Sequence, residues 1–87
     1  MTKLYTYCLF DRQGIFYGVY SSLKAIHRDA LKLCNKGRAN VLMSYQGATQ
    51  SATLVNLRNT LKGQCDVQVV YHAGQHRAAI LKGKLKE

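Results

Sequence analysis

Residues 3–20 have the sequence KLYTYCLFDRQGIFYGVY. The segments 3–10 and 15–20 are rich in aromatic, Thr, Leu, Ile and Val residues, which favour β-strands. Between them, Asp11 favours the start of a turn, and Gly14 supplies the positive φ needed at the end of such a turn. The stretch therefore predicts a β-hairpin, from which the rest of the chain is interpreted.

A helix is predicted directly after this hairpin. Ser21 and Ser22 offer a hydroxyl for its N-cap, and Gly37 suits its C-terminal end. Apolar residues follow at spacings of three and four, which places them on one helical face: Leu23, Ile26, Ala30, Leu33 and Cys34. Residues 39–45 (ANVLMSY) then predict a third strand, and residues 46–50 predict a polar loop.

The second half of the chain predicts a shorter helix and two further strands. Ser51 is the candidate N-cap of this helix, and Gly63 lies just past its end. Its apolar stripe is Leu54, Leu57 and Leu61. Residues 65–71 (CDVQVVY) alternate apolar and polar side chains, as in a strand with one buried face. Residues 73–76 predict a tight turn and residues 78–86 a last strand.

The predicted order of elements is ββαβαββ. Runs of strands interrupted by two helices favour an α+β fold with one mixed or antiparallel sheet and both helices packed on one face. The length of 87 residues suits a single domain that covers residues 1–87.

Charge is the strongest functional signal in the sequence. The chain has 13 Lys and Arg residues against 4 Asp and Glu residues, a formal net charge of +9. Such a charge destabilises a compact domain by self-repulsion unless a polyanion binds it. The commonest cellular polyanions are RNA and DNA, and phosphate contacts release counterions whatever the base sequence. We therefore expect a nucleic-acid partner.

Basic residues recur at helical and strand spacings. Steps of four along the first helix drift by only about 40° each, which gathers its cations on one side. In the last strand, lysines alternate with other residues and share a face. The predicted nucleic-acid-binding residues are Lys24, Arg28, Lys32, Lys36, Arg38, Lys82 and Lys84. The alternative interpretation is a solvated surface without a ligand.

Aromatic residues concentrate in the predicted hairpin. An open sheet face that carries aromatic rings can stack nucleic-acid bases. Phe16, Tyr17 and Tyr20 are the stacking candidates, and strand alternation predicts Phe16 and Tyr20 on one side with Tyr17 on the other. The alternative is that these rings belong to the core or its rim.

Several kinds of chemistry find no support. The acids Asp11, Asp29, Asp66 and Glu87 form no pair suited to a two-metal nuclease. The cysteines Cys8, Cys34 and Cys65 match no zinc pattern, and free thiols point to a reducing, cytoplasmic compartment. No window reaches the about 18 apolar residues of a membrane span, and the interrupted N-terminal run predicts no signal peptide. We expect no metal and no cofactor.

Residues 3–46 resemble the hybrid-binding domain of eukaryotic ribonuclease H. The resemblance lies in a strand, a turn, the stretch Gly18-Val19-Tyr20-Ser21-Ser22, a helix and Ala39-Asn40-Val41. It implies a hairpin–helix unit that grips RNA and DNA backbones, although Leu23 stands where that family has Trp. In size and charge the chain also resembles small phage early proteins, among them the T-even inhibitors of RNA-cutting toxins. This second resemblance implies an RNA-associated inhibitor.

The leading hypothesis is a non-enzymatic nucleic-acid-binding protein that favours RNA, in the manner of a phage-type inhibitor of a host RNA-targeting toxin or nuclease in the host cytoplasm. One alternative is a protein inhibitor whose basic face docks on an acidic host protein. The other is a small metal-independent ribonuclease with His72 and His76 as acid and base. His27 lies near the apolar face of the first helix and is expected to be packed. An exposed edge strand leaves a dimer open.

Overall fold

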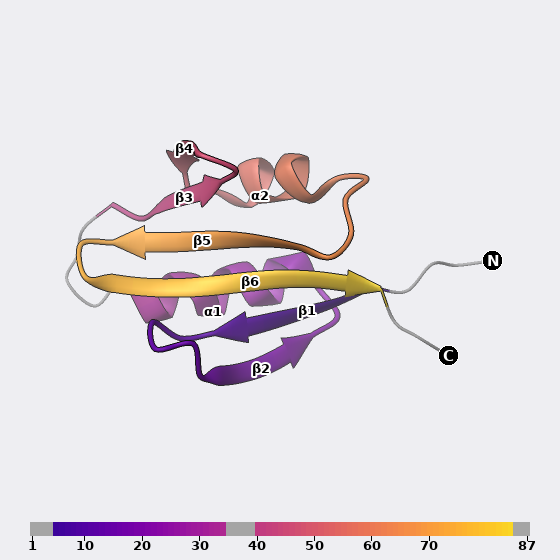
Figure 1. The fold of residues 1–87 in the computed structure, drawn as a ribbon, viewed down its shortest axis with the longest axis horizontal. Helices are drawn as coiled ribbons and strands as arrows, with labels where there is room; N and C mark the ends of the chain where they lie inside the picture. Colours follow the sequence, from indigo (N-terminus) through magenta and orange to yellow (C-terminus); the bar gives the residue numbers. More distant parts are fainter. Residues whose placement is uncertain (1–4, 35–39, 85–87) are drawn as a thin grey trace.

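The computed structural model describes residues 5–34 and 40–84. The chain forms β1 (Tyr5–Phe10), β2 (Phe16–Tyr20), α1 (Leu23–Cys34), β3 (Leu42–Tyr45), β4 (Ala48–Ser51), α2 (Leu54–Leu61), β5 (Val67–Ala73) and β6 (His76–Lys84) (Figure 1). The α+β class is confirmed. The predicted order ββαβαββ is present, with β4 as one additional strand.

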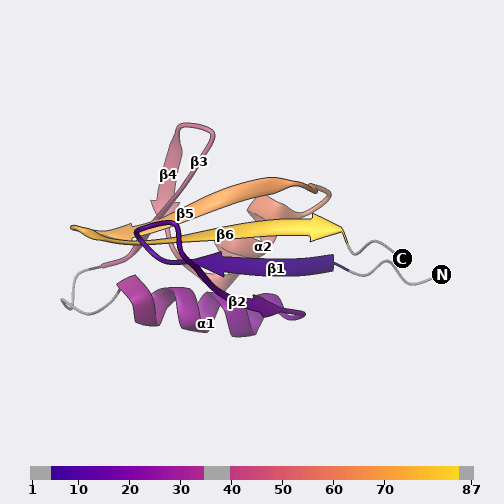
Figure 2. The same cartoon turned by 60° about the horizontal axis from the view of Figure 1, so that its bottom comes forward.

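All strands belong to one antiparallel sheet with the order β2-β1-β6-β5-β3-β4. The hairpin β5–β6 lies in the middle, and the hairpins β1–β2 and β3–β4 flank it. Both helices cover the same face, as predicted. Figure 1 looks onto the open face of the sheet with α1 behind β1 and β6, and Figure 2 shows α1 below these strands.

The core lies between the sheet and the helices because alternate strand residues point to the same face. Leu9 of β1, Tyr71 of β5 and Ile80 of β6 are completely buried there. On α1, residues at spacings of four complete this layer, as the apolar periodicity predicted. The buried apolar residues are Tyr7, Leu9, Ile26, Ala30, Cys34, Met43, Leu57, Leu61, Val69, Tyr71, Ala73, Ala78 and Ile80.

The predicted loop 46–50 is wrong, because this segment forms a turn followed by β4. Gln46 and Gly47 both have positive φ, at 50° and 84°, as in the two-residue turns that join tight hairpins. Ser51 consequently belongs to β4 and is not the N-cap of α2. Thr53 takes that role, since its hydroxyl accepts a hydrogen bond of 3.1 Å from the backbone N–H of Asn56.

A β-bulge overturns the predicted sides of the β2 aromatics. Tyr20 pairs with Tyr7 and Gly18 pairs with Leu9, but Phe10 pairs with Phe16. One extra residue of β2 therefore lies between Phe16 and Gly18. The extra residue reverses the alternation, so Phe16 lies on the open face beside Phe10, with ring centroids 5.9 Å apart. Tyr20 lies on the helix-covered face. Phe16 and Tyr20 therefore do not share a side.

A hydrogen bond fastens the edge strand β2 to α1. The Tyr20 hydroxyl donates to Asp29 Oδ2 at 2.6 Å, and Arg28 Nε donates to Asp29 Oδ1 at 3.1 Å. These donors, Tyr20 first, lower the pKa of the Asp29 carboxyl. Burial and the bond to Asp29 raise the pKa of Tyr20 to about 12. Both shifts mark a contact that is strongest when Asp29 is ionised and Tyr20 is protonated.

We predict that Tyr20→Phe lowers the free energy of unfolding by about 1 kcal/mol at neutral pH, since a partly buried hydrogen bond to a charged group is lost. The lowered carboxyl pKa contributes stability that disappears as the pH falls below about 4, and the raised phenol pKa contributes stability that disappears above about pH 10. The difference from wild type is thus constant between about pH 5 and 9 and shrinks outside this window.

Urea unfolding at a series of pH values measures this difference. Tyr17→Phe is the matched control, because Tyr17 is an exposed tyrosine of the same strand. Its stability should match wild type at every pH. A difference for Tyr20→Phe that is the same at all pH values would contradict the assignment.

Candidate nucleic-acid interface

The outer side of α1 carries Lys24, Arg28 and Lys32, which we call the cationic strip. All three side chains are exposed. They follow one another at one-turn intervals of about 6 Å along the helix axis. Arg28 contacts Asp29, whose carboxylate is shared with Tyr20, and this is the one ion pair among the described residues. The strip therefore presents a row of positive charge to solvent.

The other predicted cations have different positions. Lys36 and Arg38 lie outside the described residues, and the side chain of Lys84 in β6 does as well. Lys82 is only 6% exposed, and its ammonium donates a hydrogen bond of 2.8 Å to the carbonyl oxygen of Leu61. The ammonium also lies 4.3 Å from the centroid of the Tyr5 ring. The prediction that Lys82 contacts phosphate is therefore wrong.

The register of β6 explains the burial of Lys82. Lys82 pairs with Tyr7 and Val67 and so points to the helix-covered face. The last carbonyl groups of a helix have no partner within the helix and carry partial negative charge. Leu61 ends α2, and its carbonyl oxygen accepts two hydrogen bonds, one from the backbone N–H of Gln64 at 3.1 Å and one from the buried ammonium. Lys82 thus caps a helix from the sheet.

A groove runs along α1, from Ser22 before its first turn to Leu31, and meets the first residue of α2. It encloses about 580 Å³ and is lined by Ser22, Lys24, Ala25, His27, Arg28, Leu31 and Leu54. Its floor is mainly apolar, and two members of the cationic strip form its rim. We call it the α1–α2 groove. Because Leu54 is distant in sequence from the rest, only the packing of the helices assembles this surface.

His27 joins the groove to the core. Its Nδ1 lies 2.7 Å from the hydroxyl of the buried Tyr71, and the two rings meet edge to face. Burial lowers the pKa of His27, which favours the neutral imidazole. The expectation of a packed histidine is confirmed, although its ring also borders the groove.

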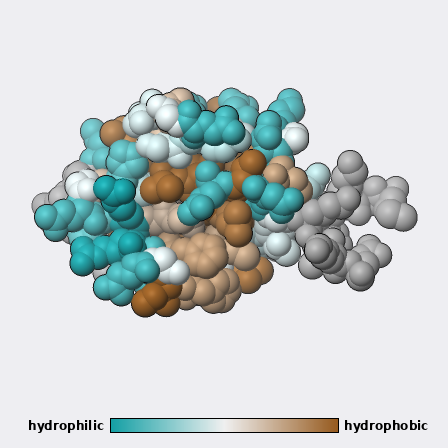
Figure 3. Space-filling view, viewed as in Figure 1, coloured by the Kyte–Doolittle hydropathy of each residue, from teal (hydrophilic) through white to brown (hydrophobic). Residues whose placement is uncertain are grey.

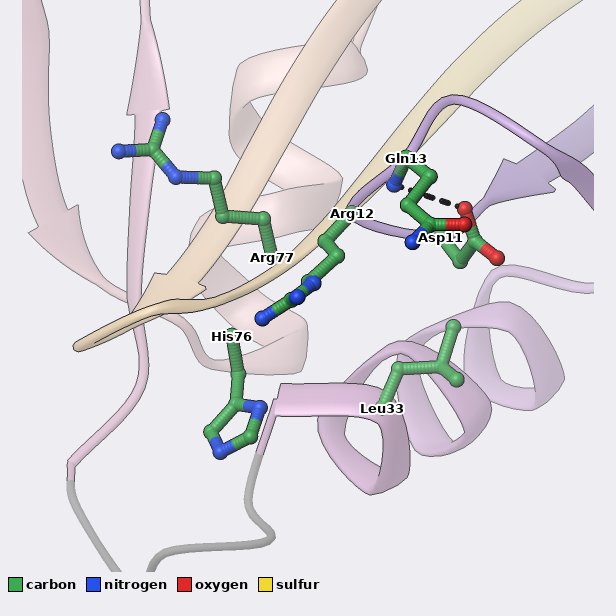
Figure 4. Close-up of a pocket in the computed structure, with 6 residues that line it drawn as sticks. All are labelled: Asp11, Arg12, Gln13, Leu33, His76 and Arg77. Carbon is green, nitrogen blue, oxygen red and sulfur yellow. Dashed lines mark hydrogen bonds between the residues drawn. The ribbon is translucent and has the colours of Figure 1, made fainter.

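A second hollow, the turn pocket, lies where two hairpin turns approach the end of α1. It encloses about 340 Å³ and is lined by Asp11, Arg12, Gln13, Leu33, His76 and Arg77. In Figure 4 the Arg12 side chain extends toward His76, whereas Arg77 extends the opposite way. Asp11 Oδ1 accepts hydrogen bonds from the backbone N–H groups of Gln13 and Ile15.

The α1 dipole distinguishes the two hollows. The groove lies at the N-terminal, partially positive end of α1, next to Lys24. The turn pocket adjoins Leu33 in the last turn, where the dipole is negative, and it contains the carboxylate of Asp11. The charged groups that line the groove, Lys24 and Arg28, are both cations, whereas Arg12 and Arg77 share the turn pocket with the carboxylate of Asp11.

The two histidines proposed for a ribonuclease are not brought together. His72 pairs with Arg77 on the open face, and its Nε2 lies 2.9 Å from the Ser44 hydroxyl. His76 pairs with the buried Ala73, so its side chain leaves the opposite face. An acid and a base must reach the same substrate atom from hydrogen-bond distance. These positions do not supply such a pair.

The open sheet face carries an apolar surface that is wider than the aromatic stacking candidates, because it also includes Ile15 and Val19, which the sequence interpretation did not single out. In Figure 3, brown and tan atoms gather in the lower middle, over β1 and β2. Ile15, Phe16, Tyr17 and Val19 are each more than half exposed. Of the stacking candidates, Phe16 and Tyr17 are thus accessible, while Tyr20 is turned toward α1. The alternation of Cys8 and Phe10 with the buried residues of β1 was the signal for an apolar open face.

Other features bear on the range of functions. In the described part of the chain, no group of three or more His, Cys, Asp or Glu side chains is placed to hold a metal ion. Neither described helix has the length and apolar character needed to cross a membrane. Comparison with protein-family models, curated proteins and solved structures finds no match to this chain.

We predict that Lys82→Met lowers the free energy of unfolding by about 1–2 kcal/mol, because the Leu61 carbonyl loses a charge-assisted hydrogen bond while the aliphatic stem is kept. Lys62→Met is the matched control, since Lys62 is exposed at the end of α2, and it should change stability by less than about 0.5 kcal/mol. Urea unfolding measures both variants. Equal stability of the two would show that the buried ammonium has no capping role.

Proposed function

We propose that this chain is a non-enzymatic nucleic-acid-binding protein that favours RNA, and that the cationic strip contacts the phosphates. The observation that carries the proposal is the exposed row of Lys24, Arg28 and Lys32 in a chain of net charge +9. The core side of α1 is apolar and buried, so these side chains face solvent along the full helix.

Electrostatics supports this use of the strip. Like charges one turn apart destabilise an isolated helix, and the fold keeps three of them with Asp29 as the acidic neighbour. Asp29 is itself committed to Tyr20 and Arg28. A bound phosphate chain would relieve the repulsion and release its own counterions. RNA covered in this way would be shielded from an RNA-cutting toxin or nuclease, which is how the chain would act as an inhibitor.

We predict that Lys24→Gln/Lys32→Gln weakens binding of a fluorescent single-stranded RNA by about tenfold and flattens the slope of log affinity against log salt by about 1.4, as expected for two lost phosphate contacts. Fluorescence anisotropy between about 50 and 200 mM salt measures both quantities. The control Arg58→Gln/Lys62→Gln removes the same charge from exposed positions on and after α2.

The control should weaken binding by less than about threefold, since only the long-range field changes. An equal loss in both double variants would reject the strip as the contact surface. Absence of salt-dependent binding by the wild type would reject the function itself.

A second function, docking to another protein, is favoured by the apolar surface of β2. Val19 is 59% exposed and Phe16 is 55% exposed, on an edge strand that contains no charged residue. Exposed apolar patches of this kind mark interaction sites, and edge strands usually carry charges that discourage association. The partner would be a protein with a complementary apolar surface.

We predict that a partner held through β2 survives nuclease treatment of a pull-down and is lost with Val19→Lys, because a buried unpaired ammonium is strongly unfavourable. Val55→Lys is the control, since Val55 is 62% exposed on α2. This variant should retain the partner. Loss of the partner on nuclease treatment of the wild type would indicate an RNA bridge and reject direct docking.

A further inference from the structure

The α1–α2 groove combines an apolar surface with positive charge, and a nucleotide combines an apolar base with negatively charged phosphate. Its floor is formed by Leu31, Leu54, Ala25 and the imidazole of His27, and its rim carries Lys24 and Arg28. The apolar floor matches the faces of a base, and the cations match the phosphates on either side of it. A volume of about 580 Å³ lies within the range of small-molecule sites.

We propose that this groove takes an unstacked base of single-stranded nucleic acid, while Lys24 and Arg28 hold the neighbouring phosphates. The proposal rests on the proposed function and makes it specific. A duplex keeps its bases paired and stacked inside, whereas a single strand can turn one out against a protein surface. The chain therefore binds single strands in preference to duplexes.

Charge complementarity selects this occupant over a purely apolar one. The cations of the groove both belong to α1, and the positive end of the α1 dipole lies at the same place. No carboxylate lines the groove, in contrast to the turn pocket with Asp11. An occupant must therefore combine a flat apolar body with negative charge close beside it.

His27 gives the groove a polar contact inside its apolar floor. Its Nδ1 is engaged by the Tyr71 hydroxyl at 2.7 Å, which leaves Nε2 as the ring nitrogen that can meet a ligand. No hydrogen bond to Nε2 occurs among the described residues. The Tyr71 hydroxyl can donate to Nδ1 or accept from it, so Nε2 can meet the edge of a base as a donor in one tautomer and as an acceptor in the other.

The test compares a fluorescent single-stranded uridine oligonucleotide of about ten nucleotides with an RNA duplex of the same length. The wild type should bind the single strand at least about tenfold more tightly at equal salt, because stacking on the groove adds to the phosphate contacts. Leu54→Ser should weaken binding of the single strand by about fivefold and leave binding of the duplex unchanged.

Val55→Ser is the matched control, since Val55 is the next residue of α2 and does not line the groove. This variant should bind both RNAs like wild type. Circular dichroism checks that each variant is folded. Equal loss in Leu54→Ser and Val55→Ser, or equal affinity of wild type for the single strand and the duplex, would overturn the groove proposal.

Photo-crosslinking of the wild type removes any dependence on a substitution. A 4-thiouridine oligonucleotide should crosslink to the tryptic peptide of residues 25–28, which contains His27. A crosslink confined to the hairpin aromatics would place the base on the open sheet face and reject the groove.

If the RNA binds through the cationic strip but without these groove signatures, the proposed function stands and the base site fails. If no RNA binds, both fail.

Discussion

The structure depends on the burial of one side of α1 against the sheet. Ile26, Ala30 and Cys34 are completely buried at spacings of four, opposite strand residues such as Leu9 and Ile80. The hydrophobic effect fixes the rotation of α1 about its own axis, and the residues on the opposite side of the helix therefore face water. The position of the cationic strip is thus a consequence of core packing, and so is the orientation of the groove that adjoins it.

Much of the fold could be predicted because its signals are local. The hairpin of β1 and β2, both helices and the strands β5 and β6 follow from alternation, spacing and turn residues. The strand β4 could not be predicted, since its sequence ATQS is polar and exposed throughout and leaves no buried side to detect. The bulge in β2 could not be predicted either. One extra residue changes the face of the sheet on which all earlier residues of the strand lie, but it leaves no mark in the composition.

The candidate site also contains some features that the sequence predicts and others that it does not. The exposure of Lys24, Arg28 and Lys32 follows from helical spacing alone. The burial of Lys82 could not be predicted, because its ammonium donates to a carbonyl oxygen of α2 that is distant in sequence. The groove could not be inferred either, since Leu54 meets α1 only through tertiary packing. In the candidate site, the features that escaped prediction are contacts between different elements of the fold.

The order of strands has a consequence for how the chain reaches this state. β6 follows all other described elements in sequence, yet it lies between β1 and β5 in the centre of the sheet. During synthesis, β1 and β5 have no shared neighbour until β6 has left the ribosome. Such non-local pairing slows folding and leaves unpaired strand edges open to association. A nascent chain of this protein is therefore most vulnerable to aggregation just before its central strand emerges.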